Sequence, residues 1–319
     1  MNSKSNLVKY IIVLGTTYSG SGAVYDYLAG RGDLRDPLLG KEYLLPQMPN
    51  GLMSLEATSG PAFHPGTSDF VISQFKKTVK KLCRSGKPWR YGEGYNFLLP
   101  SFEKQIEEFI NEICAANFPM RLTWQRLMKS QSPIRYFINL LNYKFNLSEK
   151  VPQSRLLVCQ NDFIIAAQNF HNKLFQIEID KRPILLNQAG SGWNPISSTK
   201  YFLNRKIVLI TRDPRDQFAE LKLFKKANSV KEFINWYKEM QIRLKHINNP
   251  LVMHIRFEDF VKNNKKMVQT LCDHVSITSN FLSNYKPNSS KKNIGKYTEF
   301  LDQKEINDIE TSLLEYIYF

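Results

Sequence analysis

Long apolar segments are missing from this sequence of 319 residues. No stretch approaches the roughly 18 consecutive apolar residues that a membrane-spanning helix needs. The polar N-terminal segment, residues 1–9, is followed by one short apolar run, Tyr10–Leu14, which does not match a signal peptide. We therefore expect a globular protein of the cytoplasm.

Cysteine is also scarce, and the four cysteines lie far apart in the sequence. They are Cys83, Cys114, Cys159 and Cys272. None has the paired spacing of a zinc site or of a thioredoxin-like redox site. We expect all four to be reduced thiols in the core.

Acidic residues are outnumbered, 29 against 44 basic residues, which gives a formal net charge of +15. The charges are dispersed and no nucleic-acid-binding motif accompanies them, so we expect no nucleic-acid partner. The densest basic cluster lies in segment 71–87, where apolar residues recur at helical spacing. Its basic face is either a solvated surface or a dock for an anionic acceptor or an anionic membrane.

A strand, a glycine-rich loop and a helix follow one another near the N-terminus. The apolar run Tyr10–Leu14 leads into Gly-Thr-Thr-Tyr-Ser-Gly-Ser-Gly, residues 15–22, and a helical pattern follows over 23–28. Such a loop gathers backbone N–H groups at a helix N-terminus and binds anions. Its glycine spacing equals the opening of a Walker A loop, but Ser21 and Gly22 replace the Lys and the Mg²⁺-binding hydroxyl. Ordinary ATP or GTP hydrolysis is therefore not expected.

A second apolar run ends abruptly in charge at Arg212, in the segment Lys206–Phe218. An Arg at the carboxyl end of a parallel strand points into the crevice where such sheets bind ligands, and its guanidinium is suited to phosphate. The alternative is an internal ion pair of Arg212 or Arg215 with a neighbouring aspartate.

The two segments together resemble the family of sulfotransferases that use 3′-phosphoadenosine 5′-phosphosulfate (PAPS). Tyr18–Gly22 resembles the family's loop for the 5′-phosphosulfate, and Arg212–Asp216 resembles its motif for the 3′-phosphate. Ile255–Phe260 and Lys291–Tyr297 are similar to a later strand end and to the C-terminal cofactor loop. The likeness spans the chain from about residue 9 onward, except for 45–150.

The resemblance implies PAPS as the donor, protein cations instead of a metal, and a specific set of donor-binding residues. They are Thr17, Tyr18, Ser19, Gly20, Ser21, Gly22, Arg212, Lys291 and Lys292. It also implies that Glu42 is the general base, because carbohydrate-acting members have a Glu at this distance beyond the loop, and an alcohol needs a base. His64 is the runner-up for this role.

Four residues depart from the family pattern. Tyr18 stands where a cation usually stabilises the departing phosphate, and Glu220 replaces a Ser that contacts the 3′-phosphate. A carboxylate repels a phosphate, so either Glu220 points away or the donor differs. Asn187 and Gln188 stand where a Lys often lies near the sulfuryl group, and both are able to donate hydrogen bonds.

The expected fold is α/β, with a mostly parallel central sheet and helices on both faces, in the P-loop-like layout that the resemblance implies. We expect one domain, 1–319, in which a mainly helical insertion, 43–150, shapes the acceptor pocket. Strands are predicted at 155–159 and 183–187, among others. Helices are predicted at 102–113, 123–143, 229–247, 260–275 and 305–314.

The predicted function is transfer of a sulfuryl group from PAPS to a hydroxyl of a carbohydrate or glycolipid. Two alternatives remain open. One is a nucleotide-dependent kinase or NTPase on the same fold, and the other is a non-enzymatic relative that binds a nucleotide or an anionic glycan.

Overall fold

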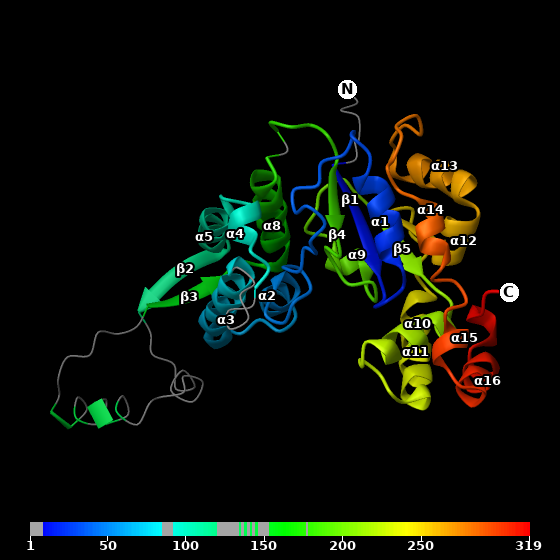
Figure 1. Ribbon diagram of the computed structural model, residues 1–319. Coiled ribbons are helices and arrows are strands. Elements are labelled where there is room, and N and C mark those ends of the chain that lie inside the picture. Colours follow the sequence, from blue (N-terminus) through cyan, green and yellow to red (C-terminus); the bar gives the residue numbers. More distant parts are fainter. Residues whose placement is uncertain are drawn as a thin grey trace. The chain divides into compact units, whose positions relative to one another are not determined.

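The computed structural model describes residues 9–84, 92–119, 153–176 and 178–319. It also describes six separate positions, Ile134, Phe137, Ile138, Leu141, Lys144 and Phe145. The chain divides into two compact units (Figure 1). Unit 1 consists of the residues up to Gln47 and from His171 onward, and unit 2 consists of Met48–Phe170.

Unit 1 is built on a parallel four-stranded sheet. Its strands, in spatial order, are β4 (Ile184–Asn187), β1 (Tyr10–Gly15), β5 (Arg205–Thr211) and β6 (Val252–Arg256). Each neighbouring pair is parallel, so all four carboxyl ends lie at one edge of the sheet. The predicted α/β class and its mostly parallel sheet are confirmed.

Both faces of this sheet are buried, which explains the continuous apolar runs of its strands. Ile11 and Val13 of β1 face a core formed with α1 (Ser21–Ala29), α12 (Phe257–Lys262) and α13 (Asn264–Val275). On the opposite face Tyr10 is in ring contact with Phe175 and Phe202. Alternate side chains of one strand therefore serve two cores.

The other helices of unit 1 follow the strands. They are α9 (Pro195–Ser198), α10 (Pro214–Leu223), α11 (Val230–Leu244), α14 (Pro287–Lys291), α15 (Tyr297–Phe300), α16 (Gln303–Ser312) and a 3₁₀ turn, Leu314–Tyr316. The predicted helices at 229–247 and 305–314 are confirmed within a few residues. The segment predicted as one helix at 260–275 is helical but divided, because α12 and α13 are separate helices that meet at Asn263.

Unit 2 combines helices with a small sheet. It contains α2 (Leu52–Ser59), α3 (Pro65–Cys83), α4 (Tyr95–Leu98), α5 (Phe102–Glu112), β2 (Cys114–Pro119) and β3 (Gln153–Leu157). A further helix, α8 (Gln160–Leu174), begins in unit 2 and ends in unit 1. The helix predicted at 102–113 is confirmed as α5. The helix predicted at 123–143 lies outside the described residues except for a few positions.

The strand predicted at 155–159 as part of the parallel sheet is misplaced. Residues 153–157 form β3, which pairs antiparallel with β2 in a separate two-stranded sheet. The physical reason is that a short apolar run does not encode its pairing partner. Arg155 and Leu156 are only half-buried, unlike the residues of β1.

Two other sequence expectations have a clear outcome. The basic segment is helical as far as Cys83, and α3 buries Ile72, Phe75 and Val79 while Lys76 pairs with Glu107 at 2.8 Å. The cysteines form no disulfide, but they are not all in the core, because Cys159 is exposed and Cys114 is half-buried. In the described part of the chain, no helix is long and apolar enough to cross a membrane.

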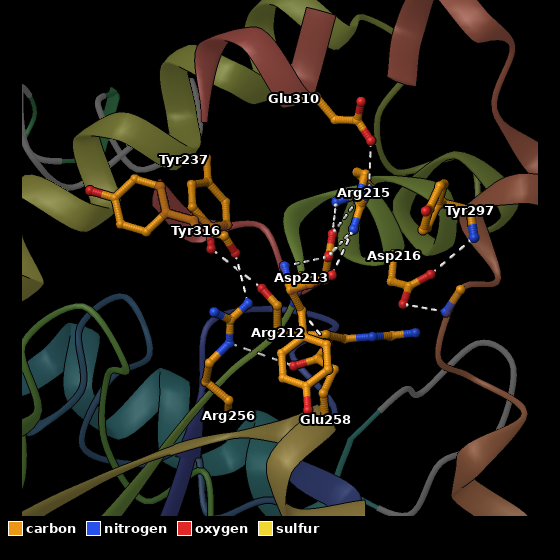
Figure 2. A network of polar contacts seen from close by, with 12 residues as sticks. Arg212, Asp213, Arg215, Asp216, Tyr237, Arg256, Glu258, Tyr297, Glu310 and Tyr316 are labelled. Atoms are coloured by element: carbon orange, nitrogen blue, oxygen red, sulfur yellow. Dashed lines mark hydrogen bonds and ion pairs between the residues drawn. The ribbon is translucent and has the colours of Figure 1, made fainter. Parts of the chain in front are cut away.

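A buried polar network fixes the start of α10 at the end of β5 (Figure 2). Asp213 caps α10 by accepting from the amide of Arg215 at 2.8 Å, and the two side chains also form an ion pair at 2.7 Å. The carboxylate of Asp216 accepts from the amides of Gly295 and Tyr297, each at 2.9 Å. The C-terminal loop is thereby attached to α10.

Glu258 supports the same network from α12. Its Oε1 accepts from the amide of Asp213 at 2.9 Å, while Oε2 lies 3.9 Å from Arg256 and accepts no hydrogen bond from the described residues. Burial of the carboxyl group raises its pKa above the ordinary 4.5. The folded chain therefore keeps this proton to a higher pH than the unfolded chain does.

This shift predicts a pH dependence of stability. As the pH rises from about 4.5 through the raised pKa, the folded state becomes charged at a cost, and the free energy of unfolding falls. The fall amounts to about 1.4 kcal/mol for each unit by which the pKa is raised. Glu258→Gln keeps an oxygen that accepts from the amide of Asp213, but it has no proton to lose. The free energy of unfolding of this variant should therefore not fall in this way as the pH rises. Urea denaturation of both proteins between pH 4 and 8 measures the difference, and parallel pH profiles would contradict the assignment.

Candidate functional site

The loop after β1 has an unusual backbone conformation. Thr17 and Tyr18 have positive φ angles of 67° and 51°, and Gly20 has a φ of 77° before α1 begins at Ser21. The amide of Thr16 donates to Oγ of Ser19 at 3.1 Å, which closes the loop on itself. The first amides of a helix have no acceptor within the helix, so the loop presents N–H groups at the positive end of α1.

The loop lines a cleft of about 730 Å³ that lies within unit 1. The lining residues come from the loop, from the segment before unit 2, from the turn after β4 and from α10. They are Gly15, Thr16, Thr17, Tyr18, Ser19, Gly20, Ser21, Gly22, Glu42, Gln47, Gln188, Ser191, Gly192, Trp193 and Glu220. This volume is in the range of small-ligand sites.

The turn after β4 fastens one side of the loop. Gln188 accepts from the amide of Gly15 at 3.2 Å and donates from Nε2 to Oγ of Ser21 at 3.1 Å. Gly192 lies so close to the loop that a Cβ there would be 2.3 Å from the carbonyl oxygen of Gly15. Gly192 is therefore required for close contact and not only for a turn.

The start of α10 fastens the other side. Nε2 of Gln217 donates to the carbonyl oxygens of Thr16 and Thr17, and Nη1 of Arg212 donates to the carbonyl oxygen of Tyr18 at 3.3 Å. Because Gln217 and Arg212 hold the carbonyl groups of Thr16, Thr17 and Tyr18 by hydrogen bonds, the orientation of these peptide groups is fixed. The two sequence motifs thus meet at the same edge of the sheet.

Arg212 is buried, with its side chain 1% exposed. Besides Tyr18, its guanidinium contacts Oε2 of Glu220 at 2.8 Å and donates to the carbonyl oxygen of Asn293 at 2.5 Å. Glu220 therefore points toward Arg212, not away from it, and lines the cleft. The alternative of an internal ion pair is confirmed for Arg215, which pairs with Asp213, whereas Arg212 pairs with Glu220 and not with an aspartate.

Glu42 lines the same cleft and is exposed. It forms an isolated β-bridge with Asn187, and the amide of Tyr43 donates to the carbonyl oxygen of Asn187 at 2.8 Å. These contacts hold the segment against the carboxyl end of β4. A carboxylate is thereby placed beside the loop after β1, although it lies 20 positions beyond Gly22 in the sequence.

The structure brings most of the predicted site residues together, but not all. The six loop positions 17–22 and Glu42 line the cleft, and Arg212 lies behind the loop. Lys291 and Lys292 are exposed and do not line it, although the neighbouring Asn293 contacts Arg212. Their role in donor binding stays a prediction.

Sequence reasoning gave no role to Gln217 or Gln47. Gln47 donates to the carbonyl oxygen of Gln188 at 2.8 Å, and Gln188 itself has a positive φ of 51°. The position of Gln217, in the first turn of a helix after a strand end, was the available signal. Nothing local marks Gln47, because its partner is distant in the sequence.

No protein-family model and no curated protein matches the chain. Among solved structures, the sulfotransferase domain of the Synechococcus PCC 7002 olefin synthase is 12% identical, with a TM-score of 0.47 and coverage of 100% of this chain and 98% of that one. The sulfotransferase domain from the curacin biosynthetic pathway is 16% identical, with a TM-score of 0.43 and coverage of 98% and 99%.

A sulfotransferase from Mycobacterium tuberculosis is 11% identical, with a TM-score of 0.40, and the match covers 97% of this chain and 77% of that one. All three structures are named as sulfotransferases or sulfotransferase domains.

The loop geometry predicts opposite responses at two of its glycines. In Gly20→Ala the alanine would have to adopt a φ of 77°, and its Cβ would lie 2.4 Å from the ring of Phe257. A Cβ at Gly22 meets nothing within 4 Å. Gly20→Ala should lower the free energy of unfolding by about 1–3 kcal/mol. Gly22→Ala is the matched control inside α1 and should leave the free energy of unfolding unchanged or raise it by up to about 1 kcal/mol. Urea denaturation measures both, and equal losses would contradict the described loop.

Proposed function

We propose that the chain is a sulfotransferase that moves a sulfuryl group from a nucleotide phosphosulfate of the PAPS type to a hydroxyl group. One observation carries the proposal: an amide-lined loop at a helix N-terminus and the carboxylate of Glu42 line the same cleft. The loop is suited to the anionic leaving group. Glu42 is suited to the proton of the acceptor.

In the proposed reaction the acceptor oxygen forms a bond to sulfur while the bond between sulfur and the bridging phosphate oxygen breaks. The phosphate oxygen keeps the electron pair, and the acceptor's proton passes to the carboxylate of Glu42. The amides of residues 19–22 and the helix dipole of α1 stabilise the charge that develops on the phosphate. Gln188, held between Gly15 and Ser21, keeps these amides in place.

The residues present fit one half of PAPS better than the other. At the 5′ side, the loop amides are joined by the buried hydroxyl of Thr16, which has no hydrogen-bond partner among the described residues. At the 3′ side, the guanidinium of Arg212 is buried and already paired with Glu220. The fit therefore supports a 5′-phosphosulfate, and it gives no free cation for a 3′-phosphate among the described lining residues.

We propose a carbohydrate or glycolipid as the acceptor. Glu42 lines the cleft and is exposed to solvent, which supports an acceptor that approaches from outside with a hydroxyl group. Trp193, which also lines the cleft, offers an aromatic surface of the kind on which a sugar face packs. The role of segment 43–150 in shaping the acceptor pocket stays a prediction.

A transfer assay tests the function. The chain is incubated with donor labelled in its sulfur atom and with a panel of hydroxyl acceptors, including a sugar glycoside, a glycolipid and a simple phenol. We expect label in an acceptor without added Mg²⁺. Transfer of phosphate from ATP with Mg²⁺ would indicate a kinase instead, and nucleotide binding without any transfer would indicate a binding protein.

The role of Glu42 is tested by Glu42→Gln. The variant should bind the donor within threefold of the wild type, because the loop is unchanged, and lose label transfer by about 100-fold or more because the base is absent. Glu299→Gln, an exposed change of the same kind on α15, is the control and should keep full activity. A fully active Glu42→Gln protein would rule out this base.

A further inference from the structure

The charges of the cleft differ from what a doubly phosphorylated nucleotide requires. Among the described residues that line it, Glu42 and Glu220 are charged, and neither lysine nor arginine is present. The loop supplies one place for an anion, through its amides. A second anionic group on the same ligand would have to lie in a cleft whose side-chain charges are both negative.

The cation nearest to the loop is not available to a ligand in this arrangement. Arg212 has its side chain 1% exposed and contacts Tyr18, Glu220 and Asn293. The guanidinium also lies over the ring of Phe257, with its Cζ 5.1 Å from the ring centroid. A phosphate in this cleft would have to displace the carboxylate of Glu220 to bind Nη1 of Arg212, because the two groups are 2.8 Å apart.

Glu220 is the group that a ligand meets instead. Its side chain is 17% exposed and lines the cleft together with the loop. An ionised carboxylate accepts a hydrogen bond from a sugar hydroxyl and repels a phosphate. Dinucleotide-binding sites use the same contrast. Sites for a ribose with free hydroxyls have an acidic residue that binds a hydroxyl, and sites for a ribose phosphate have an Arg nearby.

We propose, on the basis of the sulfotransferase function proposed above, that Glu220 makes the site selective for a donor whose ribose hydroxyls are free. The donor class is then a nucleoside 5′-phosphosulfate without a 3′-phosphate. The bond changes are those of the proposed transfer, and the product that leaves with the electron pair is a nucleoside 5′-monophosphate. Glu220 acts as a specificity-determining residue, with Arg212 holding it in place.

The inference is tested by comparing two product nucleotides, adenosine 5′-monophosphate and adenosine 3′,5′-bisphosphate, by titration calorimetry at one fixed salt concentration. The wild-type chain should bind the monophosphate at least as tightly as the bisphosphate. Tighter binding of the bisphosphate would overturn the inference and leave the sulfotransferase function intact. Failure of both nucleotides to bind would remove the proposed function itself, and the inference with it.

Glu220→Gln provides the second arm. Gln keeps an oxygen acceptor for Arg212 and removes the negative charge, so affinity for the bisphosphate should rise about tenfold or more, while affinity for the monophosphate changes less than threefold. Glu299→Gln removes an exposed charge on α15 and should change neither affinity. An unchanged preference in Glu220→Gln would also overturn the inference. The wild-type comparison stands even if this variant fails to fold.

Discussion

The parallel pairing of β1 with β5 is the interaction on which the rest of the site depends. Its register runs from Tyr10 opposite Arg205 to Gly15 opposite Ile210, so both strands end at the same edge of the sheet. The loop and the start of α10 therefore leave the sheet side by side, and Gln217 is able to hold the loop's carbonyl groups. A site made from distant segments thus follows from one pair of hydrogen-bonded strands.

The electrostatics of the cleft come from the backbone more than from side-chain cations. The chain has a formal net charge of +15, yet the described side chains that line the cleft and carry charge are Glu42 and Glu220. Peptide N–H groups at a helix N-terminus bind an anion without a lysine, and they do so only when their geometry is fixed. Gln188, which bonds to Gly15 and Ser21, and Gln217, which bonds to the carbonyl oxygen of Thr16, supply that constraint. Overall charge therefore says little about the ligand here.

Much of the sheet and the loop was predictable from the sequence, because their signals are local. An apolar run that ends in glycine and restarts as a helix indicates its own geometry, and the capping Ser229 likewise marks the start of α11. Pairing partners and side-chain directions are not local. The sequence shows neither that β3 pairs antiparallel with β2 nor that Glu220 turns toward Arg212, because each depends on a segment that folding brings near.

The central claim is that the loop after β1 holds the phosphate of a nucleotide. A crystal structure of the chain with adenosine 5′-monophosphate tests this claim most directly. The account predicts phosphate oxygens within hydrogen-bond distance of the amides of residues 19–22, with the carboxylate of Glu42 beside the same cleft. A nucleotide bound elsewhere, with these amides contacting only solvent, would contradict it.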